Sequence, residues 1–175
     1  PCLAVPSITL ADCVDQISRV DLLADPGREF HFGAASFQVA GRVAEVAGGL
    51  SWAALFEEKV RHPLQLTDTA YGATQNPRIA TGLRSTLLDY ASLLRMHAGQ
   101  GLFGPSRVLQ PVTVREMQRD ATRGAPLVDS PYPDGRRYGL GVWRDADGAA
   151  GDAAQPSDQG ESGVSPWLDR PRRLV

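Results

Sequence analysis

The sequence predicts a mainly helical chain of the α+β class, with its strands near the C-terminus. Apolar residues recur at helical spacing in several segments between residues 10 and 117. Large and small residues alternate from Tyr138 to Trp143, as they do along a strand that a neighbouring backbone or a ligand approaches on one face. A length of 175 residues with 42% apolar residues fits one domain or part of one.

The first predicted helix covers residues 10–19. Thr9 and Asp12 have the spacing of a capping box, and apolar residues follow at helical intervals at Leu10, Cys13, Val14 and Ile17. Residues 25–27 then predict a turn, because proline restricts φ and glycine tolerates positive φ. A short extended segment is expected at residues 30–32.

Two further helices are predicted to pack as a hairpin before Pro63. The first covers residues 35–47 and has a polar face, with Gln38, Arg42 and Glu45, and an apolar face, with Val39, Ala40, Val43, Val46 and Ala47. Gly48 and Gly49 end it, and Ser51 caps the next helix. Pro63 stops that second helix, whose expected buried stripe is Trp52, Leu55, Phe56 and Val60.

The clearest helical pattern begins after Thr86. Thr86 and Asp89 repeat the capping spacing, and a broad apolar surface follows at Leu87, Leu88, Tyr90, Ala91, Leu93, Leu94 and Met96. Gly99 and Gly101 end this helix, and Pro111 suits the first position of a shorter helix through Met117. We expect residues 121–137 to be loop, residues 145–157 to be an exposed connection and residues 164–168 to form a last strand.

Charge and composition argue against two classes of function. The net charge of −2 provides no broad basic field for nucleic acid, and no apolar run is long enough to cross a bilayer. Two states are open for Cys2 and Cys13, a disulfide or two free thiols. Cys13 lies on the apolar stripe of the first helix, which favours a buried, reduced thiol. The cellular compartment is not predicted.

The sequence resembles a known family in three segments, residues 26–30, 37–43 and 63–69. The resemblance continues at residues 80–86, 89–90, 138–143 and 166–169. On these residues the chain resembles an internal portion of a β-lactamase-related serine hydrolase, a family with class C β-lactamase, penicillin-binding-protein-like and esterase-like branches. The resemblance implies a partial β-lactamase/transpeptidase-like domain over residues 1–175. It would have a mainly helical region at residues 1–137 and one to three antiparallel strands bordering the site at residues 138–175.

The resemblance implies that no catalytic set is complete in this chain. In this family a Ser-x-x-Lys element places the nucleophile and its lysine on one helical turn. No serine here is followed three residues later by lysine, and Lys59 is the only lysine. Phe32 occupies the position of a family tyrosine, and a phenyl ring cannot exchange a proton. His31 is a conceivable substitute base, but an exposed histidine is favoured, because neighbours along an extended chain point to opposite sides.

The third element of the family, usually Lys-Thr-Gly or His-x-Gly, aligns with Asp158, Gln159 and Gly160. The glycine is kept, but Asp158 replaces the cationic or imidazole residue, and an acid there repels a substrate carboxylate. Glu161 adds a second acid. Residues 160–163 read Gly-Glu-Ser-Gly, which is similar to the Gly-Asp-Ser-Gly segment of trypsin-like proteases. Because the helical pattern conflicts with their all-β fold, Ser162 is interpreted as a turn residue.

No cofactor and no metal ion are expected. The sequence has no Gly-x-Ser-x-Gly elbow, phosphate loop or paired His/Cys metal spacing. His62 and His97 fall at predicted helix ends, where the terminal carbonyls attract them. Several aromatic residues at loop and strand edges are expected to pack the core rather than line a substrate cleft: Tyr71, Tyr132, Tyr138, Trp143 and Trp167.

Two functions follow from the resemblance. The first is part of a serine hydrolase that forms an acyl-enzyme on esters or amides, esterase-like or penicillin-binding-like, and inactive as this chain because the Ser-x-x-Lys element is absent. The second is a catalytically silent binding module of the same fold, which Phe32 and Asp158 favour. The expected partner is a small ester or amide substrate of the longer protein, without nucleic acid or a membrane span. Exposed strand edges and an apolar face predict self-association.

Overall fold

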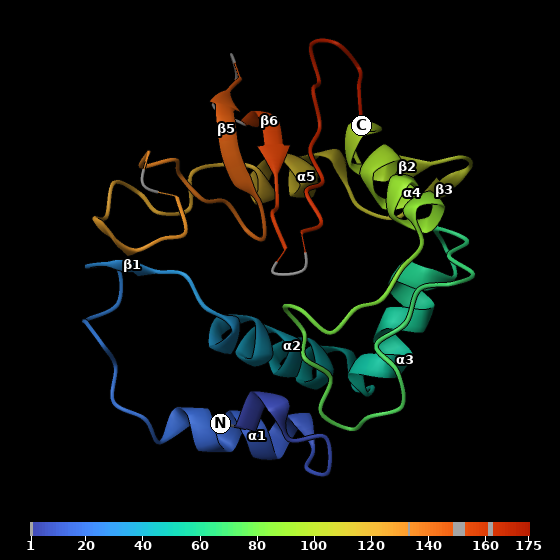
Figure 1. Cartoon of the computed structure of the whole chain (residues 1–175). Helices are drawn as coiled ribbons and strands as arrows, with labels where there is room; N and C mark the ends of the chain where they lie inside the picture. The colour runs from blue at the N-terminus through green and yellow to red at the C-terminus, as the bar shows by residue number, and fades with distance from the viewer. Residues whose placement is uncertain (1, 133, 149–152, 161–162) are drawn as a thin grey trace. The chain divides into compact units, whose positions relative to one another are not determined.

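The computed structural model describes residues 2–132, 134–148, 153–160 and 163–175. The chain divides into two compact units, Pro1–Leu23 with Gly33–Asp89, and Ala24–Phe32 with Tyr90–Val175. The elements of the first unit, several of them labelled in Figure 1, are η1 (Cys2–Ala4), α1 (Leu10–Ser18), α2 (Ala34–Gly48), α3 (Trp52–Phe56) and the π-helical turn η2 (Glu57–Arg61).

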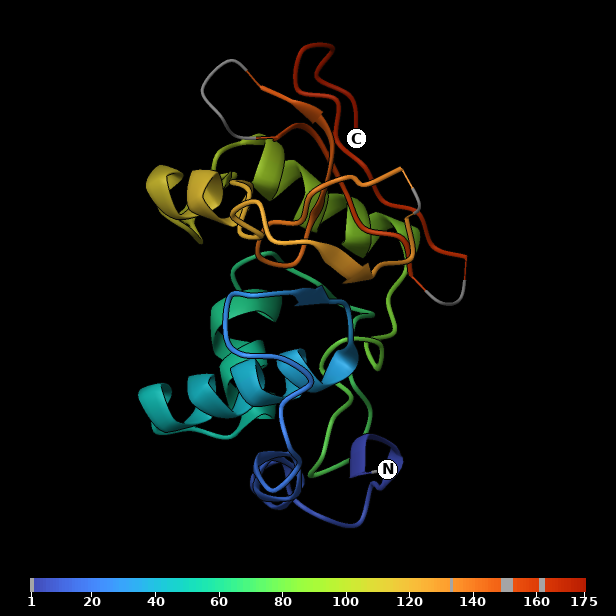
Figure 2. The ribbon, with the colours of Figure 1, turned by 90° about the vertical axis from the view of Figure 1, so that its left-hand side faces the viewer.

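Helix α1 begins as the capping box predicts. Thr9 Oγ1 accepts a hydrogen bond from the Asp12 N–H at 3.0 Å, and Asp12 Oδ2 accepts one from the Thr9 N–H at 2.9 Å. These two bonds satisfy backbone donors that the first helical turn leaves free. Helix α1 packs against α2, beside which it lies in both views (Figures 1 and 2).

The prediction of reduced cysteines is wrong. Cys2 and Cys13 form a disulfide, with their Cα atoms 5.2 Å apart, and both residues are buried. The 3₁₀ turn η1 returns the start of the chain to the buried side of α1, which brings Cys2 to Cys13. The apolar stripe of the first helix correctly indicated that Cys13 is buried. The position of Cys2 depends on the turn η1, which was not predicted from the sequence.

Helix α2 forms where predicted, but the buried face is different. Val43 and Val46 are 61% and 68% exposed, whereas Gln38 and Gly41 are buried. A Cβ atom at position 41 would lie 2.9 Å from Ile79 Cγ1, so glycine permits a close approach of the 76–79 loop. The helix therefore packs through a small residue and a hydrogen-bonded glutamine, and its valines face outward.

The expected pairing of α2 with α3 is present. Gly49 adopts a left-handed conformation at the C-cap of α2, with φ of 66°, and Ser51 Oγ accepts a hydrogen bond from the Ala54 N–H at 3.3 Å. Glu45 ties the two helices together by accepting a hydrogen bond from the Trp52 N–H at 2.7 Å. The predicted buried stripe of the second helix is only half-buried: Trp52, Leu55, Phe56 and Val60.

The second unit contains short strands and two helices. Its elements are β1 (Phe30–His31), most of α4 (Leu87–Ala98), β2 (Leu102–Phe103), β3 (Ser106–Arg107), α5 (Pro111–Met117), β4 (Leu127–Asp129), β5 (Trp143–Asp147) and β6 (Ala153–Ser157). Helices α4 and α5 match the predicted segments, and Thr86 Oγ1 accepts a hydrogen bond from the Asp89 N–H at 3.2 Å. Leu87 and Leu88, predicted on the apolar surface, are 85% and 80% exposed.

The predicted strand over residues 138–143 is a turn instead. Tyr138 and Trp143 form an isolated antiparallel bridge, and the Gly139 N–H donates to Val142 O at 2.8 Å. A Cβ atom on Gly139 would lie 2.1 Å from Met117 O, so the small residue does permit the expected close approach of another backbone. The alternation of large and small residues therefore marks a tight reversal before β5.

Strand β1 lies in the extended segment expected at residues 30–32, but β4, β6 and most of β5 lie where loop or an exposed connection was predicted. Strands β5 and β6 form an antiparallel pair over most of residues 145–157, the segment expected to be an exposed connection, and β5 begins two residues earlier, at Trp143. Strand β4 lies in the predicted 121–137 loop and pairs in parallel with β1. In the described part of the chain, residues 164–168 contribute one isolated bridge, from Trp167 to Ser157, rather than a strand.

Candidate functional site

Asp158, Gln159 and Gly160 directly follow β6 and begin a reversal of the chain. The Asp158 N–H donates to Pro166 O at 3.1 Å, and the Gly160 N–H donates to Val164 O at 2.8 Å. Asp158 is half-buried, whereas Gln159 and Gly160 are exposed. Of these three residues, only Asp158 lines a cavity in the described part of the second unit.

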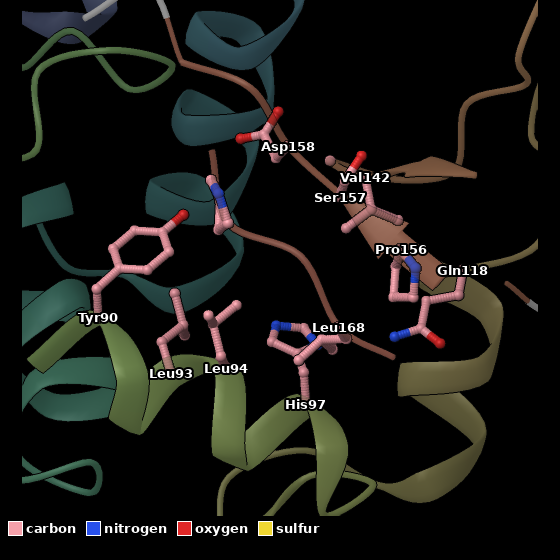
Figure 3. A pocket seen from close by; sticks show the side chains of 12 residues that line it. Tyr90, Leu93, Leu94, His97, Gln118, Val142, Pro156, Ser157, Asp158 and Leu168 are labelled. Atoms are coloured by element: carbon pink, nitrogen blue, oxygen red, sulfur yellow. The ribbon is translucent and has the colours of Figure 1, made fainter. Parts of the chain in front are cut away.

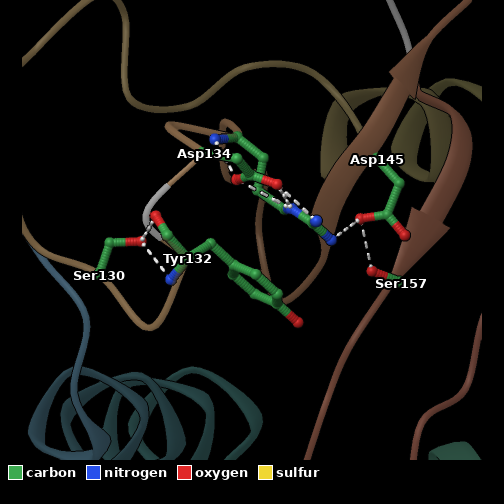
Figure 4. A network of polar contacts seen from close by, with 6 residues as sticks. Ser130, Tyr132, Asp134, Asp145 and Ser157 are labelled. Carbon is green, nitrogen blue, oxygen red and sulfur yellow. Dashed lines mark hydrogen bonds and ion pairs between the residues drawn. The ribbon is translucent and has the colours of Figure 1, made fainter.

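A polar network holds the end of β6 (Figure 4). Ser157 Oγ donates to Asp145 Oδ1 at 2.9 Å, and Arg136 Nη1 donates to the same oxygen at 2.6 Å. Arg136 also binds Asp134 at 2.6 Å, and its guanidinium carbon lies 4.0 Å from the centre of the Tyr132 ring. These contacts fix the position of Ser157 and therefore the point at which Asp158 leaves the strand.

The cavity has a volume of about 100 Å³ and lies between α4, the end of α5 and the segment that follows β6 (Figure 3). Its apolar wall includes Leu93, Leu94, Val142 and Leu168. Its polar lining includes Tyr90 and Asp158 on one side of the view and Gln118 on the other. A pocket with mostly apolar walls and a few polar groups is the usual form of a small-molecule site.

Burial controls the protonation of the groups in this cavity. It raises the pKa of the Asp158 carboxyl, since the charged form is poorly solvated there. Burial also raises the pKa of the Tyr90 hydroxyl, and the negative charge of Asp158 raises it further. Burial lowers the pKa of the His97 imidazole, and the positive charge of Arg170 lowers it further. Tyr90 and His97 are therefore uncharged at neutral pH.

Phe32 lies in an aromatic cluster of the second unit. Its ring centre is 5.7 Å from that of Tyr138 and 5.3 Å from that of Trp143, and the Tyr132 ring is 4.7 Å from Trp143. Tyr138 and Trp143 are buried, as expected for aromatic residues that pack the core, whereas Trp167, of which the same was expected, is 45% exposed. Phe32 provides apolar packing at a position where the resemblance predicts a proton-relay tyrosine.

The sequence reading missed two cavity residues. Gln118 was not singled out, and Tyr90 was interpreted only as part of the apolar face of α4. The sequence offers one signal for Gln118, its place one helical turn after Val114, which puts the two residues on the same face of the predicted helix. In the structure they are 1% and 0% exposed. Glutamine at a buried helical position indicates either a hydrogen-bonded core residue or a polar group that faces a cavity.

Comparisons with known proteins identify the family. Residues 4–157, most of the chain, match the family model for β-lactamase. This chain belongs to the β-lactamase family. The predicted α+β fold is confirmed, as part of a β-lactamase-type domain. No match was found among curated protein sequences.

Solved structures of three other proteins are similar to this chain in fold. A protein assigned as a β-lactamase from Bacteroides dorei DSM 17855 is 33% identical, with a TM-score of 0.85 over 98% of this chain and 56% of that one. EstCE1, described as a hydrolase with promiscuous acyltransferase activity, is 21% identical, with a TM-score of 0.71 over 94% of this chain and 54% of that one. An octameric penicillin-binding protein homologue from Pyrococcus abyssi is 15% identical, with a TM-score of 0.71 over 97% of this chain and 43% of that one. This chain therefore spans about half the length of these structures.

The only lysine of this β-lactamase-family chain is not placed as a catalytic base. Lys59 lies in η2, its side chain is 66% exposed, and its Nζ donates to Glu58 Oε1 at 2.6 Å. Phe56 stands three residues before it, where the family element requires serine. Lys59 is therefore not paired with a serine on one helical turn, as the family element requires.

Other predictions concern residues outside the cavity. His31 pairs with Glu29 at 2.9 Å, so its imidazole has a carboxylate partner on its own strand segment. Glu161 and Ser162 lie outside the described residues. Within the described part of the chain, no helix is long and apolar enough to span a membrane, and no cluster of three His, Cys, Asp or Glu residues could hold a metal ion. The assignments of Phe32, Asp158, Gln159 and Gly160 to the family elements stay predictions.

Proposed function

We propose that this chain is part of a serine hydrolase that acts on small esters or amides through an acyl-enzyme, and that the chain by itself does not catalyse the reaction. Membership of the β-lactamase family supports the reaction class. The observation that carries the proposed inactivity is the missing Ser-x-x-Lys element, since no serine in the chain stands three residues before Lys59.

The packing of Phe32 is consistent with the proposed inactivity. A proton relay needs a side chain that can give up and regain a proton, and the Phe32 ring instead lies among other rings. Restoring a hydroxyl there would still leave the chain without a nucleophile. We therefore propose that two parts of the reaction are absent, the attacking oxygen and one member of its relay.

Asp158 supports a preference for small uncharged acyl groups. Asp158 is half-buried and lines the cavity, and at the position that we assign to the third family element its carboxylate would repel a substrate carboxylate, such as the one that penicillins carry. A small neutral ester does not meet that repulsion. In the longer protein, we expect esters to be better substrates than penicillins.

The test of inactivity combines turnover with direct detection of an adduct. The purified chain is incubated with p-nitrophenyl acetate and, separately, with a fluorescent penicillin, and intact mass is measured over time. We expect p-nitrophenol release no faster than from a heat-unfolded sample of the same chain, and no adduct on serine. The Phe32→Tyr variant is the matched control, and it should also stay inactive. A stoichiometric acyl adduct on any serine, Ser157 included, would overturn the proposal.

The alternative is a silent binding module of the β-lactamase fold, which the apolar packing of Phe32 favours. The coding sequence upstream of Pro1 distinguishes the hydrolase from the binding module. An intact Ser-x-x-Lys element in the same reading frame supports the hydrolase. A complete gene without that element supports the binding module.

A further inference from the structure

The turn η1 (Cys2–Ala4) is attached to the first unit through a buried cysteine rather than through an apolar face. Cys2 is 4% exposed and forms the disulfide with Cys13, which is 0% exposed. Residues 4–7, which follow, are exposed. An exposed stretch buries little apolar surface, so it contributes little to its own attachment. The disulfide is therefore the covalent tie that keeps η1 against α1.

Hydrogen bonds join η1 to the loop of residues 74–79. Asn76 Nδ2 donates to Cys2 O at 2.9 Å and to Val5 O at 3.0 Å. The Asn76 residue is 3% exposed, and a buried side-chain amide needs a partner for each of its two N–H bonds. Both partners of this amide are carbonyls at η1, so the satisfaction of Asn76 depends on the position of η1.

The same loop is connected to both helices of the first unit that η1 contacts. Asn76 Oδ1 accepts a hydrogen bond from Gln38 Nε2 at 2.9 Å, and Gln38 Oε1 accepts one from the Ile79 N–H at 3.1 Å, which ties the loop to α2. The Leu10 N–H donates to Gln75 O at 3.0 Å, which ties it to the first turn of α1. One contiguous set of hydrogen bonds therefore runs from the disulfide through η1 to α1 and α2.

A dithiol can break the covalent tie. One of its thiolates attacks a sulfur of the Cys2–Cys13 bridge and forms a mixed disulfide, and its second thiolate then displaces the protein sulfur. The dithiol ends as a cyclic disulfide, oxidised by two electrons, and its two protons pass to the two cysteines, which end as thiols. Because both cysteines are buried, the attack takes place when η1 opens locally.

Reduction changes the balance of free energies that hold η1. The loop closed between Cys2 and Cys13 no longer restricts the chain, so η1 gains conformational freedom when it leaves α1. Asn76 then loses the acceptors of both its N–H bonds. A buried donor without a partner is costly, so we expect the loop of residues 74–79 to move until the Asn76 amide reaches water.

We propose that the Cys2–Cys13 disulfide is a redox-sensitive latch, which holds η1 on Asn76 when oxidised and releases both η1 and the loop of residues 74–79 when a dithiol reduces it. The response is local to the first unit, because all of these residues belong to it. The latch is independent of the proposed hydrolase function, since none of these residues lines the cavity beside Asp158.

The test compares hydrogen–deuterium exchange of the ¹⁵N-labelled chain before and after reduction with dithiothreitol. Cys2 and Cys13 are the only cysteines, so the reagent breaks no other bond, and a thiol titration confirms each state. We expect the N–H groups of Asn76 and Ile79 to exchange about tenfold faster or more in the reduced chain. The Asn76 side-chain NH₂ resonances should move toward those of a solvated amide. Exchange in the second unit, such as that of the Arg144 N–H, should change by less than about twofold.

A variant and its control separate the disulfide from the reagent. Cys2→Ala removes the bridge without a reductant, so it should reproduce the fast exchange of Asn76 and Ile79 and should not respond to dithiothreitol. Ser7→Ala, at an exposed residue that follows η1, keeps the bridge and should behave as the unmodified chain does. If Cys2→Ala does not fold, the two redox states of the unmodified chain decide.

Two results would refute the latch. Equal exchange of the Asn76 and Ile79 N–H groups in the two redox states would show that the disulfide does not control the loop. Faster exchange throughout the second unit as well would show that reduction lowers the stability of the whole chain rather than opening η1 and the loop.

Discussion

Gln38 is buried although the residues around it predict a solvent-facing position on α2. Its Nε2 donates to Asn76 Oδ1 at 2.9 Å and to Pro77 O at 2.8 Å, and its Oε1 accepts a hydrogen bond from the Ile79 N–H at 3.1 Å. Asn76 in turn donates to Cys2 O and Val5 O. One glutamine therefore joins α2 to a loop that is about forty residues away in the sequence, and a helical periodicity cannot reveal such a partner.

Replacing Gln38 should destabilise the chain strongly. In Gln38→Leu, the Asn76 amide oxygen, the Pro77 carbonyl and the Ile79 N–H each lose a partner in a buried or half-buried place. We expect the free energy of unfolding to fall by roughly 2 to 4 kcal/mol, measured by urea denaturation. Gln16→Leu, at an exposed position of α1, should change it by less than about 0.5 kcal/mol. Equal effects of the two substitutions would contradict this account of Gln38.

At the scale of elements, Asp89 links the first turn of α4 to the preceding loop. The sequence identified Asp89 as part of a helix cap, and its N–H does bind Thr86. The Asp89 carboxylate, in contrast, contacts the preceding loop. Its Oδ2 accepts hydrogen bonds from the Asp68 N–H and from Thr69 Oγ1, both at 2.8 Å. The loop of residues 67–69 is therefore anchored to the helix by a single carboxylate.

The hydrogen bonds of the Asp89 carboxylate predict that the stability of the fold depends on pH. The hydrogen bond from Thr69 lowers the pKa of Asp89 below its ordinary value of 3.8. A depressed folded-state pKa means that the carboxylate stabilises the fold above the unfolded-state pKa, and that this stability is lost as the pH falls through the folded-state value. Asp89→Asn should therefore lower the Tm at pH 7, and the Tm difference from the unmodified chain should shrink in acid.

The pH dependence of Asp89→Asn needs a control, the same substitution at an aspartate that is exposed. Asp21→Asn changes an exposed residue in the same unit and should leave the Tm nearly unchanged at every pH. Thermal unfolding followed by circular dichroism from about pH 2 to pH 7 measures all three proteins, a range that spans the titration of carboxyl groups. A Tm difference for Asp89→Asn that does not vary with pH would show that the charge is not the cause.

At the scale of the whole molecule, many large apolar side chains are exposed. Val39, Val43 and Val46 follow one another at helical spacing on α2, and Val43 and Val46 are 61% and 68% exposed. Leu22, Leu23, Leu87 and Leu88 are each at least 75% exposed. Contiguous apolar residues on a surface favour association with another surface.

We expect the chain to self-associate through the α2 valines. Sedimentation equilibrium at several concentrations should give a weight-average mass that rises above the chain mass of 18.8 kDa. The double variant Val43→Gln/Val46→Gln should lower this association. Val112→Gln/Val128→Gln removes the same number of exposed valines elsewhere and should associate as the unmodified chain does. A monomer with a sharp, reversible thermal transition would contradict the expectation.

The helices were predictable because their signals are local. The capping box of Thr9 and Asp12, the glycines after α2 and the proline that begins α5 act within a few residues of the helix that they start or end. The family could also be recognised from the sequence, because its packing and turn segments are spread along most of the chain. The absence of a Ser-x-x-Lys element is likewise a property of the sequence alone.

The tertiary structure decided what depends on distant partners. Residues 145–157 were predicted to be an exposed connection because they are polar and rich in glycine and alanine, yet they form most of the β5–β6 pair. Arg144, at the start of this pair, is 8% exposed, and its guanidinium binds the carbonyl of Gln118. The disulfide needed the turn η1, and the burial of Gln38 needed the 76–79 loop. The cavity beside Gln118 combines residues from α4, the end of α5 and the chain after β6. A helix cap is settled by neighbours in the chain, whereas burial and strand pairing are settled by neighbours in space, and only folding brings those together.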